Sequence, residues 1–321
     1  MVRLERSAEM LSELGIEQIT IPLPFRLNHV NCFLAEGSRG WTIIDAGLHT
    51  TVTKNMWKPI IEKHEIKDMV ITHYHPDHFG YAGELQKLTG AEVWMTEIDK
   101  ECGLTYWENN SLDVVKENYK KCGLPLQLAS ELTSDEESFN GKVKPYPEVQ
   151  RIIEEEMKFQ FGKHEYEVIF TPGHSDGLFV LYNKENGILL STDHVLPKIS
   201  PNISYWFRGD PNPLQAYINS LEKIKKLNAD YVIPSHFKPF RNANKRIEEL
   251  LAHHEERLEV TYKSIRKPST IFEVTTEMFN HLNLHEMRFA IGETLAHLEY
   301  LVSNDQCKKF LEGNTWYYEA I

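Results

Sequence analysis

Five short apolar runs in this 321-residue chain are each followed by a residue that can bind a metal ion or support a metal ligand. Runs of this length, bounded by turn residues, are typical of buried β-strands. When several buried strands are each followed by polar residues, we expect a rigid sheet core with a functional site along one edge, where the loops hold the reactive side chains. The runs are residues 41–44 before Asp45, 69–72 before His73, 167–171 before His174, 188–192 before Asp193, and 231–234 before His236.

The densest group of these polar residues is the segment His73-Tyr74-His75-Pro76-Asp77-His78. Three imidazoles and a carboxylate so close together in sequence indicate a metal site. Thiolate ligation is not indicated, because the four cysteines are scattered and form no C-x-x-C pair. Imidazole and carboxylate ligands suit zinc, and they also suit iron or manganese.

The candidate ligands are numerous enough for two divalent ions, of which zinc is the expected identity and iron or manganese the alternatives. Asp45 is expected to orient a ligand imidazole, a support that metal sites usually require. A simple turn before Gly47 is the alternative for Asp45. The predicted ligands are His73, His75 and His174 for one ion, Asp77, His78 and His236 for the other, and Asp193 as a carboxylate able to bridge both.

Helical patterns alternate with the predicted strands. An i, i+3/i+4 apolar stripe that begins at Pro213 predicts a helix packed on the sheet, and a second long helix is expected from near Asn244. On that second helix, His253 and His254 are expected on a solvated or ion-paired face. Residues 101–150 interrupt this alternation of strands and helices, and within them a helix is expected from Ser111 to Lys121. An insertion of this length is often a lid or a binding loop, and a solvent-exposed segment without such a function is the alternative.

The end of the chain changes in composition after Lys267-Pro268. A stripe of apolar residues from Ile291 to Leu301 predicts a helix, and Gly313-Asn314 predicts the turn of a small hairpin. We therefore expect a catalytic domain over residues 1–265 and a small C-terminal domain over residues 266–321. Acidic residues outnumber basic ones in that last segment, which argues against the recognition of DNA by this segment.

The net charge of -12 narrows the class of partner. A strongly acidic protein repels polyanions, so nucleic acid is disfavoured as a partner, although a local basic groove is compatible with a negative total. No apolar run approaches the roughly 18 residues needed to cross a bilayer, and no signal-peptide core is present. We expect a cytoplasmic protein that acts on a small molecule, without a membrane partner, and homo-oligomerisation is compatible with the sequence.

The order of these landmarks resembles that of the metallo-β-lactamase fold superfamily. The resemblance implies an α+β fold, a four-layer αββα sandwich with the metals at one edge of its two sheets. It rests on the H-x-H-x-D-H motif at residues 73–78, Asp45 in Ile-Ile-Asp-Ala-Gly, the Thr-Pro-Gly-His that ends at His174, the strand-end Asp193, and His236.

Within that superfamily the chain is most similar to the hydroxyacylglutathione-hydrolase-like branch with a C-terminal winged-helix-like domain. Residues 193–197, 201–204 and 252–258 carry this similarity. The chain departs from the family pattern near the pocket, with Gly80-Tyr81-Ala82-Gly83 after the first motif and Ser235-His236-Phe237 at the last histidine. Bulk at Phe79, Tyr81 and Phe237 is expected to narrow the pocket.

Further pocket candidates follow the bridging carboxylate. His194, Tyr205, Trp206 and Arg208 are placed near the metals by their position in the sequence. For His194 a structural hydrogen bond is the preferred interpretation over a contact with substrate, and core or loop packing is the alternative for the other three residues.

The resemblance implies a binuclear metal-dependent hydrolase that uses a metal-bound hydroxide on a small acyl substrate, a thioester, ester or lactone. Asp77 is the expected catalytic residue, which binds metal and orients the hydroxide or passes its proton. The alternatives are a phosphodiesterase or ribonuclease of the same fold, a metal-bound non-catalytic binding protein, and an oxygen-using iron enzyme. Blockage of the site by Tyr81 or Phe237 would favour the binding protein.

Overall fold

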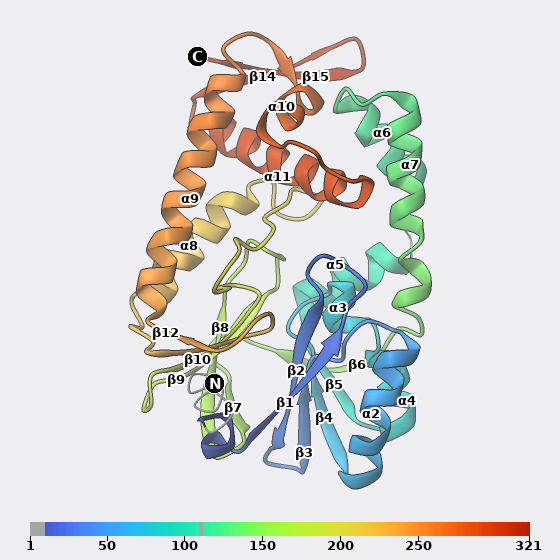
Figure 1. Ribbon diagram of the computed structural model, residues 1–321, viewed down its shortest axis with the longest axis vertical. Helices are drawn as coiled ribbons and strands as arrows, with labels where there is room; N and C mark the ends of the chain where they lie inside the picture. Colours follow the sequence, from blue (N-terminus) through green and yellow to red (C-terminus); the bar gives the residue numbers. More distant parts are fainter. Residues whose placement is uncertain (1–9, 109–111) are drawn as a thin grey trace.

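The computed structural model describes residues 10–108 and 112–321, and within them two six-stranded sheets pack face to face (Figure 1). The two sheets confirm the predicted sandwich. The first sheet has the order β1 (Ile16–Pro22), β2 (His29–Glu36), β3 (Trp41–Ile44), β4 (Ile66–Val70), β5 (Glu92–Thr96) and β6 (Val149–Ile153). The second has the order β12 (Phe240–Arg241), β11 (Tyr231–Pro234), β10 (Ile188–Thr192), β9 (Phe179–Asn183), β8 (His164–Phe170) and β7 (Lys158–Phe161).

Alternation along the strands builds three apolar layers. In β2, Phe33 and Ala35 pack between the two sheets, while Cys32 and Leu34 face the helices outside the first sheet. Successive side chains of a strand point to opposite faces, so a strand covered on both sides is apolar throughout. This double burial explains why the core strands are continuous apolar runs in the sequence.

Helices cover the outer face of each sheet. On the first sheet, α2 (Thr51–Lys63) contributes Trp57 and α4 (Ala82–Thr89) contributes Leu85 to the packed layer. On the second sheet lie α8 (Pro213–Lys225) and α9 (Ala243–Ser264), whose first turns are capped by Asn212 and Asn242. The predictions of helices from Pro213 and from near Asn244 are both confirmed.

The side chain of His254 on α9 is not solvated as predicted. It is 1% exposed, because α11 (Leu284–Ser303) packs against this face of α9 and brings His297 next to it. His254 follows Leu250 by four residues and precedes Leu258 by four, so it lies on the apolar stripe of its helix.

The segment predicted as an insertion forms α5 (Glu97–Glu108), α6 (Leu112–Lys121), α7 (Leu126–Glu137) and the short η1 (Asn140–Lys142). The predicted helix ends at Lys121 as expected, and its expected first residue, Ser111, lies outside the described residues. Tyr119 and Leu132 of this segment share one apolar cluster with Leu295 and Tyr318 of the C-terminal segment. Helices α6 and α7 and the end of the chain therefore form one packed body above the sandwich (Figure 1). A lid function for it remains a prediction.

The C-terminal segment contains β13 (Ser269–Thr270), α10 (Ile271–Met278), α11, β14 (Cys307–Glu312) and β15 (Thr315–Ala320). The predicted hairpin is confirmed, with Gly313-Asn314 between β14 and β15. Each of the two helices begins with a capping box, made by Thr270 with Glu273 and by Asn283 with Glu286. Among the described helices, none has an apolar stretch long enough to span a membrane.

Candidate metal centre

Loops at one edge of the two sheets bring the seven predicted ligands together. From the first sheet, His73 follows β4, and the short helix α3 (Pro76–Phe79) carries Asp77 and His78. From the second sheet, the ligands follow β8, β10 and β11 in turn, which is the strand-end arrangement that the sequence predicted. Within the described residues, the donor atoms form three groups: His73, His75 and His174; His73, His78 and Asp193; and Asp77, His78 and His236.

Asp193 lies at the centre of this cluster. Its Oδ2 is 3.4 Å from His174 Nε2 and 3.3 Å from His236 Nε2, and its Oδ1 is 3.5 Å from His78 Nε2. Two donors on one tetrahedral zinc at 2.0–2.1 Å are separated by roughly 3.3 Å. The carboxylate thus joins both halves of the donor set at separations that suit metal ligands.

Several buried donor atoms in the cluster have no hydrogen-bond partner in the described part of the chain. They are His73 Nε2, His78 Nε2, His236 Nε2 and Asp193 Oδ1. A buried polar atom without a partner costs about 1–3 kcal/mol, so groups of them in a native protein need a cause. Bound metal ions supply that cause, and the donor set therefore fits the ions that the sequence predicts.

Asp45 holds the imidazoles of the first sheet from behind. Its Oδ2 lies 2.7 Å from His78 Nδ1 and accepts a 2.9 Å hydrogen bond from Thr72 Oγ1, which is itself 3.0 Å from His73 Nδ1. Its Oδ1 accepts a hydrogen bond from the Thr72 backbone N–H. One carboxylate thus orients two imidazoles, one directly and one through a hydroxyl, as expected of a residue that supports metal ligands.

Backbone carbonyls orient the imidazoles of the second sheet. His174 Nδ1 donates to the carbonyl of Asn202 at 2.8 Å, and His236 Nδ1 donates to the carbonyl of His29 at 2.6 Å. These bonds leave Nε2 of both rings facing Asp193. Sequence reasoning missed Asn202 and His29 because a carbonyl group is common to every residue and carries no side-chain signal.

Asp99, which sequence reasoning also missed, ties two ligand loops together. This buried residue of α5 accepts hydrogen bonds from Tyr74 N at 3.2 Å, Ser175 Oγ at 2.8 Å and Gly177 N at 2.7 Å. Tyr74 lies between two predicted ligands and Ser175 follows a third. Burial raises the pKa of Asp99 to about 7 despite these bonds. The available signal was its position just after the end of β5, which repeats the strand-end pattern of the other sites.

Burial and nearby charge divide the histidines of the cluster into two kinds. Burial and neighbouring imidazoles lower the pKa of His73 and His75 well below the ordinary value, so both rings are neutral and offer a lone pair. For His78 and His236, burial opposes protonation, but the facing carboxylates, Asp193 foremost, raise the pKa. Metal binding at that second group must therefore displace protons.

Two of the predicted pocket residues line a hollow that reaches the cluster. Trp206 and Arg208 share it with His174 and Tyr74, and its volume is about 20 Å³. The guanidinium of Arg208 is stacked over the ring of Tyr106, 3.2 Å from the ring centroid. A space of this size holds a water molecule, so an acyl substrate must displace side chains to enter.

The structure places the other predicted pocket residues differently. Phe79, at the end of α3, and Tyr81, just before α4, are fully buried in the layer between the first sheet and its helices. His194 is also fully buried, packs edge-on to Tyr217, and has its pKa lowered to about 3 by burial.

The remaining two predicted pocket residues are aromatic, and the structure places them in different surroundings. Tyr205 packs against the cores of the second sheet and the C-terminal segment. The half-buried ring of Phe237 lies between His29 and Lys198, and its backbone N–H donates to His29 Nε2.

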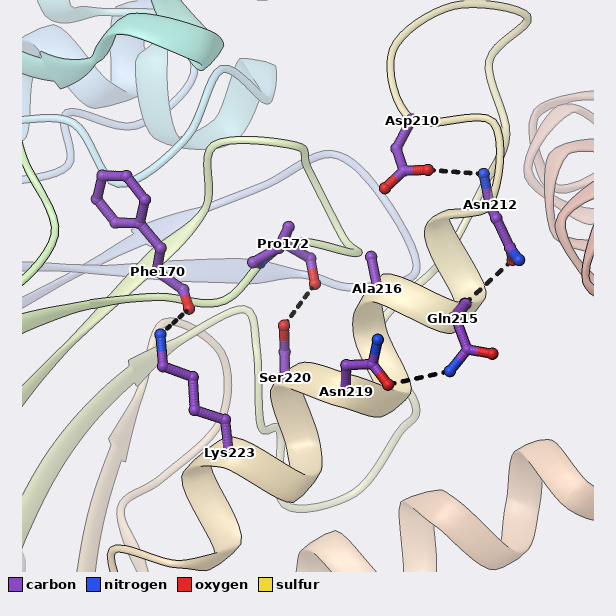
Figure 2. Close-up of a pocket in the computed structure, with 9 residues that line it drawn as sticks. All are labelled: Phe170, Pro172, Asp210, Asn212, Gln215, Ala216, Asn219, Ser220 and Lys223. Atoms are coloured by element: carbon purple, nitrogen blue, oxygen red, sulfur yellow. Dashed lines mark hydrogen bonds between the residues drawn. The ribbon is translucent and has the colours of Figure 1, made fainter.

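A second, larger groove of about 520 Å³ lies along α8 and contains none of the seven ligands (Figure 2). Its polar groups hold the helix to the sheet: Lys223 Nζ donates to Phe170 O, Ser220 Oγ donates to Pro172 O, and Asn212 caps the helix. These groups are already engaged, so the groove offers little to a ligand and we place the chemistry at the His/Asp cluster.

Comparison with known proteins agrees with this geometry. Residues 26–236 match the metallo-beta-lactamase superfamily, and residues 258–320 match the family described as metallo-beta-lactamase-like, C-terminal domain. The probable metallo-hydrolase YqjP of Bacillus subtilis (strain 168) is 25% identical over 319 residues, which are 94% of this chain and 97% of that protein.

Two solved structures are similar over nearly their whole length. A metallo-beta-lactamase family protein, TTHA1429 from Thermus thermophilus, superposes with a TM-score of 0.85 at 28% identity and covers 96% of this chain and 99% of its own. A beta-lactamase domain protein from Burkholderia ambifaria has a TM-score of 0.86 at 30% identity, with 96% and 92% covered.

Proposed function

Because this chain belongs to the metallo-beta-lactamase superfamily and is a metallo-hydrolase, we propose that it hydrolyses a small acyl compound, a thioester, ester or lactone, at a binuclear centre. The observation that carries the proposal is the convergence of buried, unpartnered donor atoms on Asp193 from both sheets. Seven ligands, one of them a shared carboxylate, suit two ions rather than one.

Each ion would have its own set of ligands and share one. His73, His75 and His174 would hold the first, Asp77, His78 and His236 the second, and Asp193 both. Two bound ions would acidify a water molecule and polarise the carbonyl of the substrate. Nitrogen and oxygen donors with no thiolate favour zinc, and they also accommodate iron or manganese.

Asp77 has the position of a proton carrier. Its Oδ2 is 3.5 Å from His236 Nε2, and its side chain is 21% exposed, whereas that of Asp193 is 7% exposed. Asp77 is thus the carboxylate of the cluster that a substrate reaches. It orients the attacking water, holds the proton that the water loses, and returns it to the leaving sulfur or oxygen as the acyl bond breaks.

The enclosure of the cluster supports a small substrate over a polymer. The hollow at His174 is walled by Trp206 and by Arg208 stacked on Tyr106. A ribonuclease must admit a chain of phosphates, and the net charge of -12 opposes its approach. Nuclease activity is therefore the alternative outcome of the test rather than a second proposal.

Several finer features remain predictions from the sequence. They are the hydroxyacylglutathione-hydrolase-like branch, the winged-helix-like character of the C-terminal segment, zinc as the resident ion, the cytoplasmic location, and the domain boundary at residue 265. We carry them forward as parts of this proposal.

The test combines elemental metal analysis with hydrolysis of a thioester, a lactone and a phosphodiester reporter by one preparation. We expect about two metal ions per chain and acyl cleavage that Asp77→Asn removes. Asp230→Asn is the matched control, because Asp230 lies on the surface and pairs with Arg241. Phosphodiester cleavage alone would replace the proposal with a nuclease, and absence of turnover on all three reporters would favour a binding protein.

A further inference from the structure

A buried cation close to the metal centre has no partner of opposite charge among the described residues. Arg288 on α11 is 8% exposed, and its Nε is buried without a hydrogen-bond partner. Among the described residues, no hydrogen bond or ion pair satisfies its guanidinium. Buried arginines are almost always paired, because the charge loses its hydration. The described residues thus provide no group that compensates the charge of this side chain.

Aromatic rings surround Arg288 on several sides. The guanidinium carbon is 4.8 Å from the ring centroid of Phe289, 5.3 Å from that of Phe139 and 5.6 Å from that of Trp206. Rings stabilise a cation through their faces and leave the in-plane N–H donors free. A planar guanidinium held in this way presents a pair of donors with the geometry of a carboxylate.

The position of Arg288 connects it to the metal centre. Trp206, one of its three aromatic neighbours, lines the hollow that contains His174. The next residue on α11, Phe289, has its carbonyl 3.5 Å from Asn202 Nδ2, and the Asn202 carbonyl orients His174. An anion bound at Arg288 would therefore lie beside the first group of ligands.

Among the described residues, no carboxylate takes this position. Glu136 of α7 is 3% exposed, and burial raises its pKa against the influence of Arg288 and Arg208. Within the described residues it makes no ion pair with either arginine at 4.0 Å or less. No carboxylate of the described residues therefore acts as the partner of Arg288, and an anion from outside the chain fits this position. The 8% exposure of this arginine favours a small anion over the phosphates of a long polymer.

Resting on the acyl-hydrolase function proposed above, we propose that the substrate carries a carboxylate group remote from the scissile bond and that Arg288 binds this carboxylate. Trp206 then lies between the bound anion and the reacting acyl group. The substrate class is the monoesters and monothioesters in which either the acid or the leaving group has a free carboxylate. Arg288 is a specificity-determining residue in this arrangement.

The test uses two pairs of substrates matched in size. In the first pair, 4-nitrophenyl monoadipate and 4-nitrophenyl hexanoate differ at the far end of the acyl chain. In the second, S-acetyl-3-mercaptopropionate and S-acetylpropanethiol differ in the leaving group. We expect a preference of about 10-fold to 100-fold in kcat/KM for the carboxylate in one of the pairs, the size of a charged hydrogen-bonded contact. Arg288→Met should remove this preference, and Arg288→Lys should retain part of it.

Arg257→Met is the matched control. Arg257 also stacks on an aromatic ring, with its guanidinium carbon 4.8 Å from the centroid of Phe279, and it donates to the Met278 carbonyl rather than facing the centre. Its substitution should leave the preference unchanged. If Arg288→Met fails to fold or to bind metal, the test uses the wild-type protein instead. Free adipate should then inhibit cleavage of 4-nitrophenyl hexanoate, whereas hexanol should not.

The outcomes separate this inference from the proposed function. Equal kcat/KM within both pairs, or a preference that persists in Arg288→Met, would overturn the role of Arg288 while acyl hydrolysis stands. A preference for a phosphate-bearing ester over the adipate ester would overturn the assignment to a carboxylate. Failure to cleave any acyl compound would instead overturn the proposed function itself.

Discussion

Two groups of buried histidines differ in how their ring nitrogens are satisfied. At the metal centre, Nε2 of His73, His78 and His236 has no hydrogen-bond partner among the described residues. Between α9 and α11, His254 Nε2 lies 3.3 Å from Ser200 Oγ, and His254 Nδ1 lies 3.4 Å from His297 Nε2. His297 Nδ1 is in turn 2.8 Å from the carbonyl of Glu293.

The difference teaches that burial of several imidazoles does not by itself make a metal site. His254 and His297 are each 1% exposed or less, as His73, His78 and His236 are, but the protein supplies their partners and no carboxylate of the described residues converges on them. At the metal centre, Thr72, Asp45 and the carbonyl of His29 each engage Nδ1 of one ring and leave its Nε2 without a partner; the rings are those of His73, His78 and His236. A free nitrogen beside a carboxylate distinguishes the ligands from structural histidines.

The sharpest test of this contrast is activity. We expect Asp77→Asn to lower kcat/KM for an acyl substrate by about 10²–10⁴-fold, the range for loss of a general base. His254→Gln should lower it less than about 10-fold, because that ring only fills the α9–α11 interface. Steady-state kinetics on both variants, with metal content measured in parallel, decide between them. Loss of bound metal in His254→Gln would show that the two groups are one functional unit.

The next effect concerns stability in acid. Burial lowers the pKa of His297 to about 4, below the ordinary 6.5, so the unfolded chain binds the proton more readily and stability falls as the pH drops below 6.5. From this ring alone we expect a loss of roughly 2 kcal/mol between pH 7.5 and pH 5. His254, whose pKa burial lowers to about 2, changes in the same direction.

The measurement is urea unfolding of chelator-treated protein at both pH values, for wild type and His297→Gln. Carboxyls such as Glu293, whose pKa burial raises to about 7, stabilise the fold on acidification and act in the opposite direction. The informative quantity is therefore the difference between the two proteins, which should shrink at pH 5. An equal difference at both pH values would contradict a neutral buried His297.

A smaller effect is expected behind the ligands. Asp45→Asn removes the acceptor of His78 Nδ1 while tolerating the left-handed backbone at this position, where φ is 60°. Metal affinity should fall about 10–100-fold, as for other partners of ligating histidines. Competition with a chelator measures it. Glu293→Gln, next to the pair of His254 and His297, should not change the metal affinity. A comparable fall in that variant would contradict the distinction between ligating and structural histidines.

The smallest effect is expected at Asp99. Asp99→Asn keeps the shape of the side chain but places an amide N–H group against one of three donors. We expect the free energy of unfolding to fall by about 1–3 kcal/mol and metal affinity to fall less than 10-fold, because the residue positions loops rather than ligands. Thermal unfolding and chelator competition report the two quantities, with Asp230→Asn as control. A fall in affinity above 100-fold would place Asp99 among the direct supports of the metal ligands.

The strands of the sandwich were predictable because their signal is local. A strand buried on both faces needs a continuous apolar run, and β10 and β11 occupy the residues that this pattern indicated. The hairpin at Gly313-Asn314 was predictable for the same reason, since its turn residues are adjacent in the chain. Phe79 and Tyr81 were misplaced because sequence position gives their distance along the chain from His78 but not the layer in which their side chains pack.

The sequence by itself determined the order of the strands, the residues that end them, and the donor chemistry of the cluster, because apolar runs and ligand types are properties of neighbouring residues. Only the tertiary structure decided which groups support those donors and what surrounds them. Asp99 joins two ligand loops, and α11 brings Arg288 beside Trp206, through contacts between segments far apart in the chain. Such contacts depend on how whole elements pack, and no local pattern of residues specifies that.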